Sequence, residues 1–577
     1  TTRSQSVLYG TMDGGLHIAD SATGKEQMVF VPSELLRNSV ASKGLVRGQT
    51  DTNSPVSGTD GMWISDSTYK TQRASSTGET STVKALKMNI YGGMRMGGES
   101  YYALNVLTPS SPKLLFRLGK DVTGFNRMGQ SWSKPVLANV RIKGENKRVM
   151  IVGGGYDQCY ENPNFALSSA VSNTDYPDTA CNNKAQAQGN AVYMVDAEKG
   201  DLLWSATFSS ATADGDKQYL KHSIVSRVSA IDRDADGLID NIYFGDLGGQ
   251  VFRADFDNNQ TKTGSTYSAF GVRVKRIANL ASNDTTNNSG WDYTGSKAPR
   301  FYEAPTLTIH DEGANTFLVV GVASGNRSTP LDVVPTVGRE KLLPSTALSG
   351  RPVNNVYGLI DRDFVNINLM KSNVTLLTSS LTLDSLQKNP QKLTGKIGDY
   401  FFKATGAKNG WYRSLSSMSD GTERGGTAFR VAGGMKAYEE PFAITGNLII
   451  PVYDPQGTGV AGQDPCKPRV VGETDRQLFC LPYGVCLKTD GTVDGGASGM
   501  ESKTGFQTKK TDCPDGAAEC NANVIGTGIR GLAMAPITST TGAACPDKTL
   551  AGNEKGTGKW TCQQIINPTK WYDKWIK

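Results

Sequence analysis

The sequence has no long hydrophobic run, few histidines and little net charge. Its longest apolar stretches, 317–323 and 447–453, fall far short of the ~18 residues that a membrane-spanning helix needs. The polar segment 1–6 is followed by no hydrophobic region, unlike a signal peptide. With 61 basic and 55 acidic residues the net charge is only +6, which argues against a dedicated nucleic-acid-binding protein. Because the chain starts without methionine, directly before a strand-like segment, we expect it to be a fragment or a processed product.

Motifs of the common enzyme classes are also missing. The three histidines, His17, His222 and His310, are far apart, and none belongs to an H-E-x-x-H zinc motif. The sequence has no G-x-S-x-G nucleophile elbow and no G-x-x-x-x-G-K-[ST] phosphate loop. The glycine-rich segments 92–98 and 245–249 do not open a helix, so they are more typical of tight turns than of phosphate sites. We therefore expect a protein that is not an enzyme.

What the sequence does contain is a series of short strands that end in glycine. The first is 7–10, followed by a turn at 13–15 and a second strand at 16–20. The same arrangement recurs at 90–93 with 101–106, 149–155 with 190–196, 242–249 with 250–255, and 318–321 with 356–361. Helical periodicity is weak. Repeated small antiparallel units predict an all-β propeller or sandwich, because a single blade cannot bury its own faces.

Long polar insertions separate the predicted strands. They are rich in Ser, Thr, Asn, Gly and Asp, and lie at 47–81, 157–189, 257–296, 326–351 and 454–523. Segments of this kind decorate a rigid scaffold and commonly carry binding functions. Disulfides would hold those that contain cysteine as small ordered structures.

The nine cysteines lie in segments rich in Gly, Ser, Asn and Asp rather than in apolar strands. This placement favours disulfides and an oxidising compartment, since free structural cysteine prefers the protein core. Proximity in the sequence predicts the pairs Cys159–Cys181, Cys513–Cys520 and Cys545–Cys562. One thiol is left over among the remaining Cys466, Cys480 and Cys486. A zinc site is the alternative, but the spacings do not match zinc ribbons or fingers and no histidine lies nearby.

The sharpest motif is the acidic loop 232–240, with the sequence DRDADGLID. Its aspartates occupy positions 1, 3, 5 and 9, and Gly237 occupies position 6, as in the first part of an EF-hand-type calcium loop. The glycine permits a sharp turn, and position 7 offers a backbone carbonyl. The predicted calcium ligands are this carbonyl, of Leu238, and the carboxylates of Asp232, Asp234, Asp236 and Asp240.

Two features of this loop depart from the EF-hand pattern. Position 12 is Tyr243 instead of Glu, and the flanking segments 224–231 and 241–244 are strand-like rather than helical. We therefore predict a calcium-binding hairpin between strands, in which Asp240 takes a larger share of the ligation. Four Asp and one Arg give the loop a charge of about −3, and a flexible carboxylate-rich loop suits Ca2+ better than the geometrically strict Mg2+. The alternative is a solvated acidic turn with no ion.

Several of these segments resemble a known family. The strand and turn pattern is similar to quinoprotein-type propeller repeats, and more narrowly to the C-terminal domain of the PilC/PilY family of type IV pilus tip-associated adhesin and biogenesis proteins. The matching stretches are 98–106, 130–136, 152–157, 191–196, 232–240 followed by 243–249, and 410–412. They spread from about residue 7 to about residue 450, and little is similar beyond 454. The acidic loop running into YFGDLGG is the most specific of them.

The resemblance implies a modified, quinoprotein-like β-propeller of about seven blades with disulfide-stapled insertions. It would form one domain over 1–577, with blades over 7–450 and with Cys-rich insertions and a closing blade at 454–577. The resemblance also implies that calcium in the loop 232–240 controls the balance of pilus extension and retraction, and with it twitching motility and surface adhesion.

The resemblance further implies where such a protein works and with what. It would be exported through the periplasm of a Gram-negative bacterium to the cell surface and would be associated with the outer membrane and the pilus tip. Its partners would be minor pilins and the pilus assembly machinery, together with a host or abiotic surface ligand and no nucleic acid. The family's N-terminal half would be missing here. The string 47–51 is not an RGD motif, so integrin binding does not transfer.

Two other functions share the propeller pattern. A quinone-cofactor dehydrogenase is expected to have adjacent cysteines near its cofactor, and this chain has none. A carbohydrate-binding propeller would use exposed tryptophans as sugar platforms, although tryptophans such as Trp132, Trp204 and Trp411 are more often packed between blades.

Overall fold

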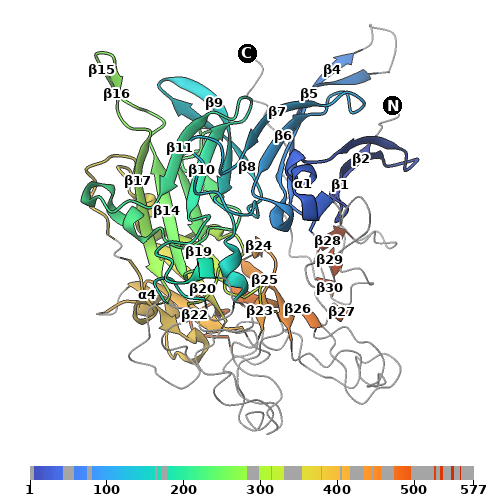
Figure 1. The fold of residues 1–577 in the computed structure, drawn as a ribbon. Coiled ribbons are helices and arrows are strands. Elements are labelled where there is room, and N and C mark those ends of the chain that lie inside the picture. The colour runs from blue at the N-terminus through green and yellow to red at the C-terminus, as the bar shows by residue number, and fades with distance from the viewer. Residues whose placement is uncertain are drawn as a thin grey trace, which may run out of the picture. The chain divides into compact units, whose positions relative to one another are not determined.

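The computed structural model describes residues 5–42, 57–73, 81–162, 165–169, 179–281, 298–313, 315–330, 354–377, 380–402, 406–415, 435–444, 446–455, 473–494 and four short strands beyond these. Nearly all of their regular structure is β-strand (Figure 1). Within these residues no helix combines the length and the apolar character that crossing a membrane requires. The contacts group the chain into two compact units, the first formed by Thr1–Thr329 with Leu359–Leu386 and the second by Pro330–Gly358 with Gln387–Lys577. A single domain over 1–577 stays a prediction.

The first unit holds most of the strands. In chain order these elements are β1 (Ser6–Gly10), β2 (Leu16–Asp20), β3 (Glu26–Phe30), α1 (Ser33–Arg37), β4 (Trp63–Arg73), β5 (Ser81–Gly93), β6 (Tyr101–Asn105), β7 (Lys113–Leu118), β8 (Val136–Ile142), β9 (Glu145–Gly153), β10 (Ala191–Asp196), β11 (Leu202–Thr207), β12 (Ser229–Ile231), β13 (Asn241–Gly245), β14 (Gln250–Phe256), β15 (Lys262–Thr263), β16 (Thr266–Tyr267), β17 (Gly271–Asn279), β18 (Thr306–Glu312) and β19 (Asn315–Ala323). Strand β20 (Asn355–Asp361) lies across the division between the units.

In the described part of the second unit, one α-helix accompanies ten strands. They are β21 (Gln387–Lys388), α4 (Ile397–Phe402), β22 (Gly410–Ser414), β23 (Lys436–Ala437), β24 (Phe442–Ile444), β25 (Asn447–Asp454), β26 (Glu473–Cys480), β27 (Gly526–Thr527), β28 (Ala533–Pro536), β29 (Lys548–Ala551) and β30 (Lys559–Trp560). The largest sheet wholly within this unit has the order β23-β25-β26-β27, with β24 paired to β25.

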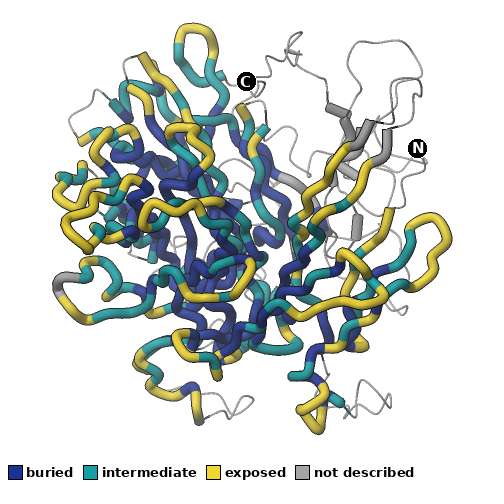
Figure 2. Tube along the Cα trace, turned by 90° about the horizontal axis from the view of Figure 1, so that it is seen from above, coloured by how far each residue is buried: buried dark blue, intermediate teal, exposed yellow. Residues whose placement is uncertain are grey.

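Three sheets of the first unit are four-stranded antiparallel meanders. Their orders are β4-β5-β6-β7, β8-β9-β10-β11 and β12-β13-β14-β17, and a three-stranded sheet, β1-β2-β3, precedes them. The strands of each sheet are arranged in chain order, and the hairpin β15-β16 is inserted between β14 and β17 of the third sheet. Strands β10, β13 and β14 are buried along nearly their whole length. Figure 2 shows the buried residues mainly in the interior of the traced chain and the exposed residues mainly on its outer loops.

The middle sheet is buried on both faces, as β10 demonstrates. Val192 and Met194 belong to one apolar cluster together with residues of β13 and β14. Tyr193 and Val195, which point to the opposite face, belong to another cluster together with residues of β5 and β6. Burial on both faces explains why the sequence has continuous apolar strands instead of an apolar and polar alternation.

The predicted fold class is therefore confirmed: the chain is all-β and is built mainly from small antiparallel sheets, which in the first unit pack face to face as propeller blades. The predicted strands 7–10 and 16–20 form β1 and β2. Strands β9 and β10 pair antiparallel across the insertion 157–189, with Val192 opposite Gly153. A total of about seven blades stays a prediction.

Two disulfides are present in the described part of the chain. Cys159 is joined to Cys181, which is the pairing predicted from the sequence. The bridge is buried among aromatic side chains that include Tyr160 and Phe165, so it fixes the ends of the insertion to the unit's interior. Cys480 is joined to Cys486, a choice that the sequence left open among three cysteines. The predicted pairs Cys513–Cys520 and Cys545–Cys562 lie outside the described residues.

Replacing both Cys159 and Cys181 by alanine should lower the free energy of unfolding of the first unit by about 3 kcal/mol, because the unfolded chain regains the freedom of the closed loop. Urea denaturation followed by tryptophan fluorescence measures this change. Ser169→Ala, in the same insertion, serves as the control and should leave the transition within about 0.5 kcal/mol of wild type. A loss no larger than the control's would contradict a stabilising role for the bridge.

Candidate metal centre

The acidic loop 232–240 joins strands β12 and β13 as a hairpin. Ile231 and Asn241, which flank the loop, are directly opposite each other in the antiparallel pair. The flanks are therefore strands, as predicted, and not the helices of an EF-hand. Within the loop, Ala235 and Gly237 have positive φ angles of 60° and 88°, which reverse the chain within a few residues.

Three of the four predicted carboxylates come together. Oxygen atoms of Asp232, Asp234 and Asp240 all lie within 4.8 Å of one another. Carboxylate oxygens that share one Ca2+ at about 2.3–2.6 Å are separated by up to roughly 5 Å, so this donor set fits the ion. Asp240 is buried, Asp232 is half-buried and Asp234 is exposed, which leaves one side of the group open to solvent.

Asp236, the fourth predicted ligand, is outside this group and organises the turn. Its Oδ1 accepts a hydrogen bond of 2.9 Å from the N–H of Leu238. Its own N–H points toward the other carboxylates, at 3.2 Å from Asp232 Oδ1 and 3.3 Å from Asp234 Oδ1. The N–H of Gly237 donates to Asp232 Oδ2 at 2.7 Å. The turn thus orients the carboxylates through its backbone.

Asp240 lies in the most enclosed part of the loop. Burial raises the pKa of Asp240 above its usual value, and the charges of Asp234 and Asp232 raise it further. Asn258, in the turn after β14, donates to Asp240 Oδ1 at 3.2 Å and to the carbonyl oxygen of Ile239 at 3.0 Å. A buried carboxylate beside two others is costly when it is charged, and a divalent cation would remove that cost. Sequence reasoning missed Asn258, whose only signal is the polar run directly after a buried strand.

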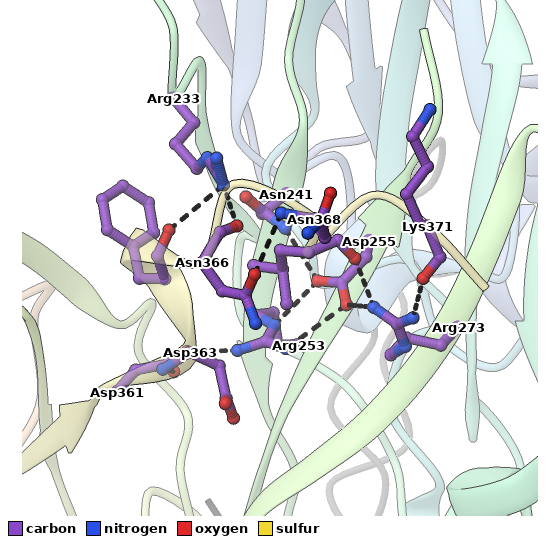
Figure 3. A network of polar contacts seen from close by, with 12 residues as sticks. Arg233, Asn241, Arg253, Asp255, Arg273, Asp361, Asp363, Asn366, Asn368 and Lys371 are labelled. Atoms are coloured by element: carbon purple, nitrogen blue, oxygen red, sulfur yellow. Dashed lines mark hydrogen bonds and ion pairs between the residues drawn. The ribbon is translucent and has the colours of Figure 1, made fainter. Parts of the chain in front are cut away.

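The strand that leaves the loop enters a buried network of charges (Figure 3). Arg253 on β14 is fully buried and lies between two carboxylates, 2.7 Å from Asp255 and 2.7 Å from Asp361. Asn241, which follows Asp240, donates to Asp255 Oδ1 at 2.7 Å. Tyr243 donates to Asp361 Oδ2 at 2.9 Å. The network ties β13, at the base of the acidic loop, to β14 and to the end of β20, and it was not predicted from the sequence.

The comparisons with known proteins agree with this architecture. No protein-family model matches the chain. The type IV pilus biogenesis factor PilY1 of Pseudomonas aeruginosa strain UCBPP-PA14 is 23% identical over 597 residues, covering 98% of this chain and 42% of that protein. The same factor from strain PAO1 is 26% identical over 327 residues, covering 56% of this chain and 23% of that protein. The crystal structure of the P. aeruginosa PilY1 C-terminal domain has a TM-score of 0.52 and 17% identity, covering 96% of this chain and 93% of that one.

The resemblance to the C-terminal domain of PilY1 is confirmed. At 17% identity the structural match shows the fold alone, and it agrees with the propeller-type sheets described above. The chain spans less than half the length of the PilY1 relative that it matches along most of its own length, since the match covers 42% of that protein.

Proposed function

We propose that this chain works in type IV pilus biogenesis as the calcium-binding C-terminal domain of a PilY1-like factor. The observation that carries the pilus role is the match to PilY1 along 98% of the chain. As for the PilC/PilY family, the protein would be located at the cell surface with the pilus and would contact minor pilins and the assembly machinery. We assign it no catalytic role.

The calcium part of the proposal is supported by the donor set of the acidic loop. Asp232, Asp234 and Asp240 would hold Ca2+, together with the carbonyl of Leu238 and with Asp236 at the rim. The ion would supply positive charge at a place where three carboxylates otherwise repel one another. Without it, that repulsion favours an open loop; with it, the hairpin is rigid. Such a loop gives one edge of the domain two states that depend on calcium, and these would set the balance of pilus extension and retraction.

A chimera tests the proposal in cells. In a P. aeruginosa strain that lacks PilY1, the gene is restored with this chain in place of the PilY1 C-terminal domain. We expect the chimera to restore surface pili and twitching motility, whereas the same chimera with Asp234→Ala should assemble pili but respond differently to calcium in the medium. Immunoblots of surface fractions control for export. A chimera that is exported at wild-type level and restores no pili would contradict the proposed function.

A further inference from the structure

Three arginines hold the segment 361–371, which begins at the end of β20, against the rest of the first unit (Figure 3). Each comes from a different element: Arg253 from β14, Arg273 from β17 and Arg233 from the acidic loop. The three arginines and the segment all belong to the same compact unit. The arrangement joins the candidate metal centre to a stretch of chain more than 100 residues further along the sequence.

The three arginines bind different parts of the segment. Arg253 pairs with Asp361 at its start, at 2.7 Å. Arg273 donates to the carbonyl oxygens of Leu369 and Lys371 near its end. Arg233 reaches the middle, where its Nη1 lies 2.8 Å from the carbonyl oxygen of Asn366 and 3.3 Å from that of Phe364. Of these three contacts, only the one in the middle of the segment therefore involves a residue of the acidic loop.

Arg233 is attached to the cation ligands by its own backbone. It lies between Asp232 and Asp234 in the sequence, and its N–H donates to Asp240 Oδ2 at 2.9 Å. Its guanidinium is directed to backbone carbonyls, so it does not act as the counter-ion of the three carboxylates. A change in the positions of those carboxylates moves the backbone of Arg233, and with it the side chain that holds the segment.

The middle of the segment exposes apolar side chains. Phe364 and Leu369 are buried and anchor it at both ends. Between them, Val365 is 46% exposed and Ile367 is 84% exposed. Hydrogen bonds from the arginines hold the backbone of this segment, so the positions of these exposed aliphatic side chains depend on those hydrogen bonds.

We propose that residues 364–367 are the cation-responsive surface of this domain and that Arg233 transmits the occupancy of the acidic loop to them. The inference rests on the calcium site proposed above. With Ca2+ bound, the loop is ordered and Arg233 holds the carbonyls of Phe364 and Asn366. Without the ion, repulsion among the carboxylates displaces Arg233 and loosens 364–367, while Arg273 still holds 369–371 and Arg253 still holds Asp361.

Hydrogen exchange measured by mass spectrometry on the whole chain tests whether Arg233 transmits calcium binding to residues 364–367. Calcium, compared with a chelator, should slow exchange in peptides that cover 364–367 by about tenfold and leave those that cover 369–371 unchanged.

Arg233→Gln should remove the calcium dependence at 364–367 and keep the calcium affinity within about threefold, because the side chain contributes no ligand. Arg273→Gln should speed exchange at 369–371 equally with and without calcium. Arg117→Gln, at a distant ion pair with Asp121, is the matched control and should change neither segment.

Calorimetry on the same samples separates the possible failures. If wild type binds calcium but hydrogen exchange at 364–367 does not change with calcium, the proposed transmission is wrong, whereas the proposed calcium site is supported. If Arg233→Gln keeps the calcium response at 364–367, the link through Arg233 is wrong. If wild type binds no calcium, both the proposed calcium site and the proposed transmission through Arg233 are wrong.

Discussion

Replacing Asp234 by alanine should lower the calcium affinity of the domain by about 100-fold or more while leaving it folded, because ligand charge strongly tunes calcium affinity. Asp234 supplies one of the three carboxylates that lie within 4.8 Å of one another, and its loss leaves two of these three. Its side chain is exposed, so the substitution creates no cavity and strands no buried group. Isothermal titration calorimetry on the purified chain, freed of metal beforehand, measures the affinity.

Two further variants sharpen this test. Asp121→Ala removes another exposed carboxylate, far along the chain from the loop, and should leave the affinity within about twofold, since exposed distant charges are screened by salt. Asp236→Asn keeps an oxygen that can accept the hydrogen bond from Leu238, so we expect a smaller loss than for Asp234→Ala. Equal affinities for wild type and Asp234→Ala would remove the site assignment.

Replacing Asp361 by alanine should destabilise the first unit by about 3–5 kcal/mol, the usual cost of breaking a buried ion pair from one side. Arg253 is fully buried, and its Nη1 would lose the carboxylate that lies 2.7 Å away. The hydroxyl of Tyr243, which is also buried, would lose its acceptor on the same carboxylate. Urea denaturation of the chain, followed by fluorescence and circular dichroism, measures the change in unfolding free energy.

The pair of Arg117 and Asp121 provides the comparison. The Asp121 side chain is 62% exposed and its partner lies four residues away, so Asp121→Ala should cost no more than about 1 kcal/mol. Each variant removes one carboxylate from one arginine, so the difference between them measures the effect of burial together with the lost acceptor of Tyr243. If Asp361→Ala were as mild as Asp121→Ala, the buried network would not be a stabilising feature of the unit.

Much of the fold was predictable from the sequence because its signals are local. The repeated pattern is an apolar strand that ends in glycine, a glycine-rich turn and a second strand that ends near Asp or Asn, so β1, β2, β9, β10, β13 and β14 were all found near their observed bounds. The acidic loop was also identified from the sequence, because its aspartates and Gly237 follow the spacing of the first part of a calcium loop. The strand-like flanks correctly predicted a hairpin in place of two helices.

The parts that could not be predicted depend on contacts between distant segments. Asp236 has the same side chain as Asp232 and Asp234, yet its carboxylate turns to the N–H of Leu238 instead of joining the group. Asn258 reaches Asp240 from a turn 18 residues further along the chain. The partner of Arg253, Asp361, lies 108 residues away, and no spacing rule connects the two.

The sequence by itself determined that this protein is built from small antiparallel sheets and that an acidic loop joins two of their strands as a hairpin. Both depend on interactions between residues that are close in the chain, which glycine positions and charge spacing reveal. Only the tertiary structure decided which carboxylates converge, which asparagine supports them and which later segment Arg233 and Arg253 hold. Those choices depend on how neighbouring sheets pack, because packing brings buried charges from separate strands to within hydrogen-bonding distance of one another.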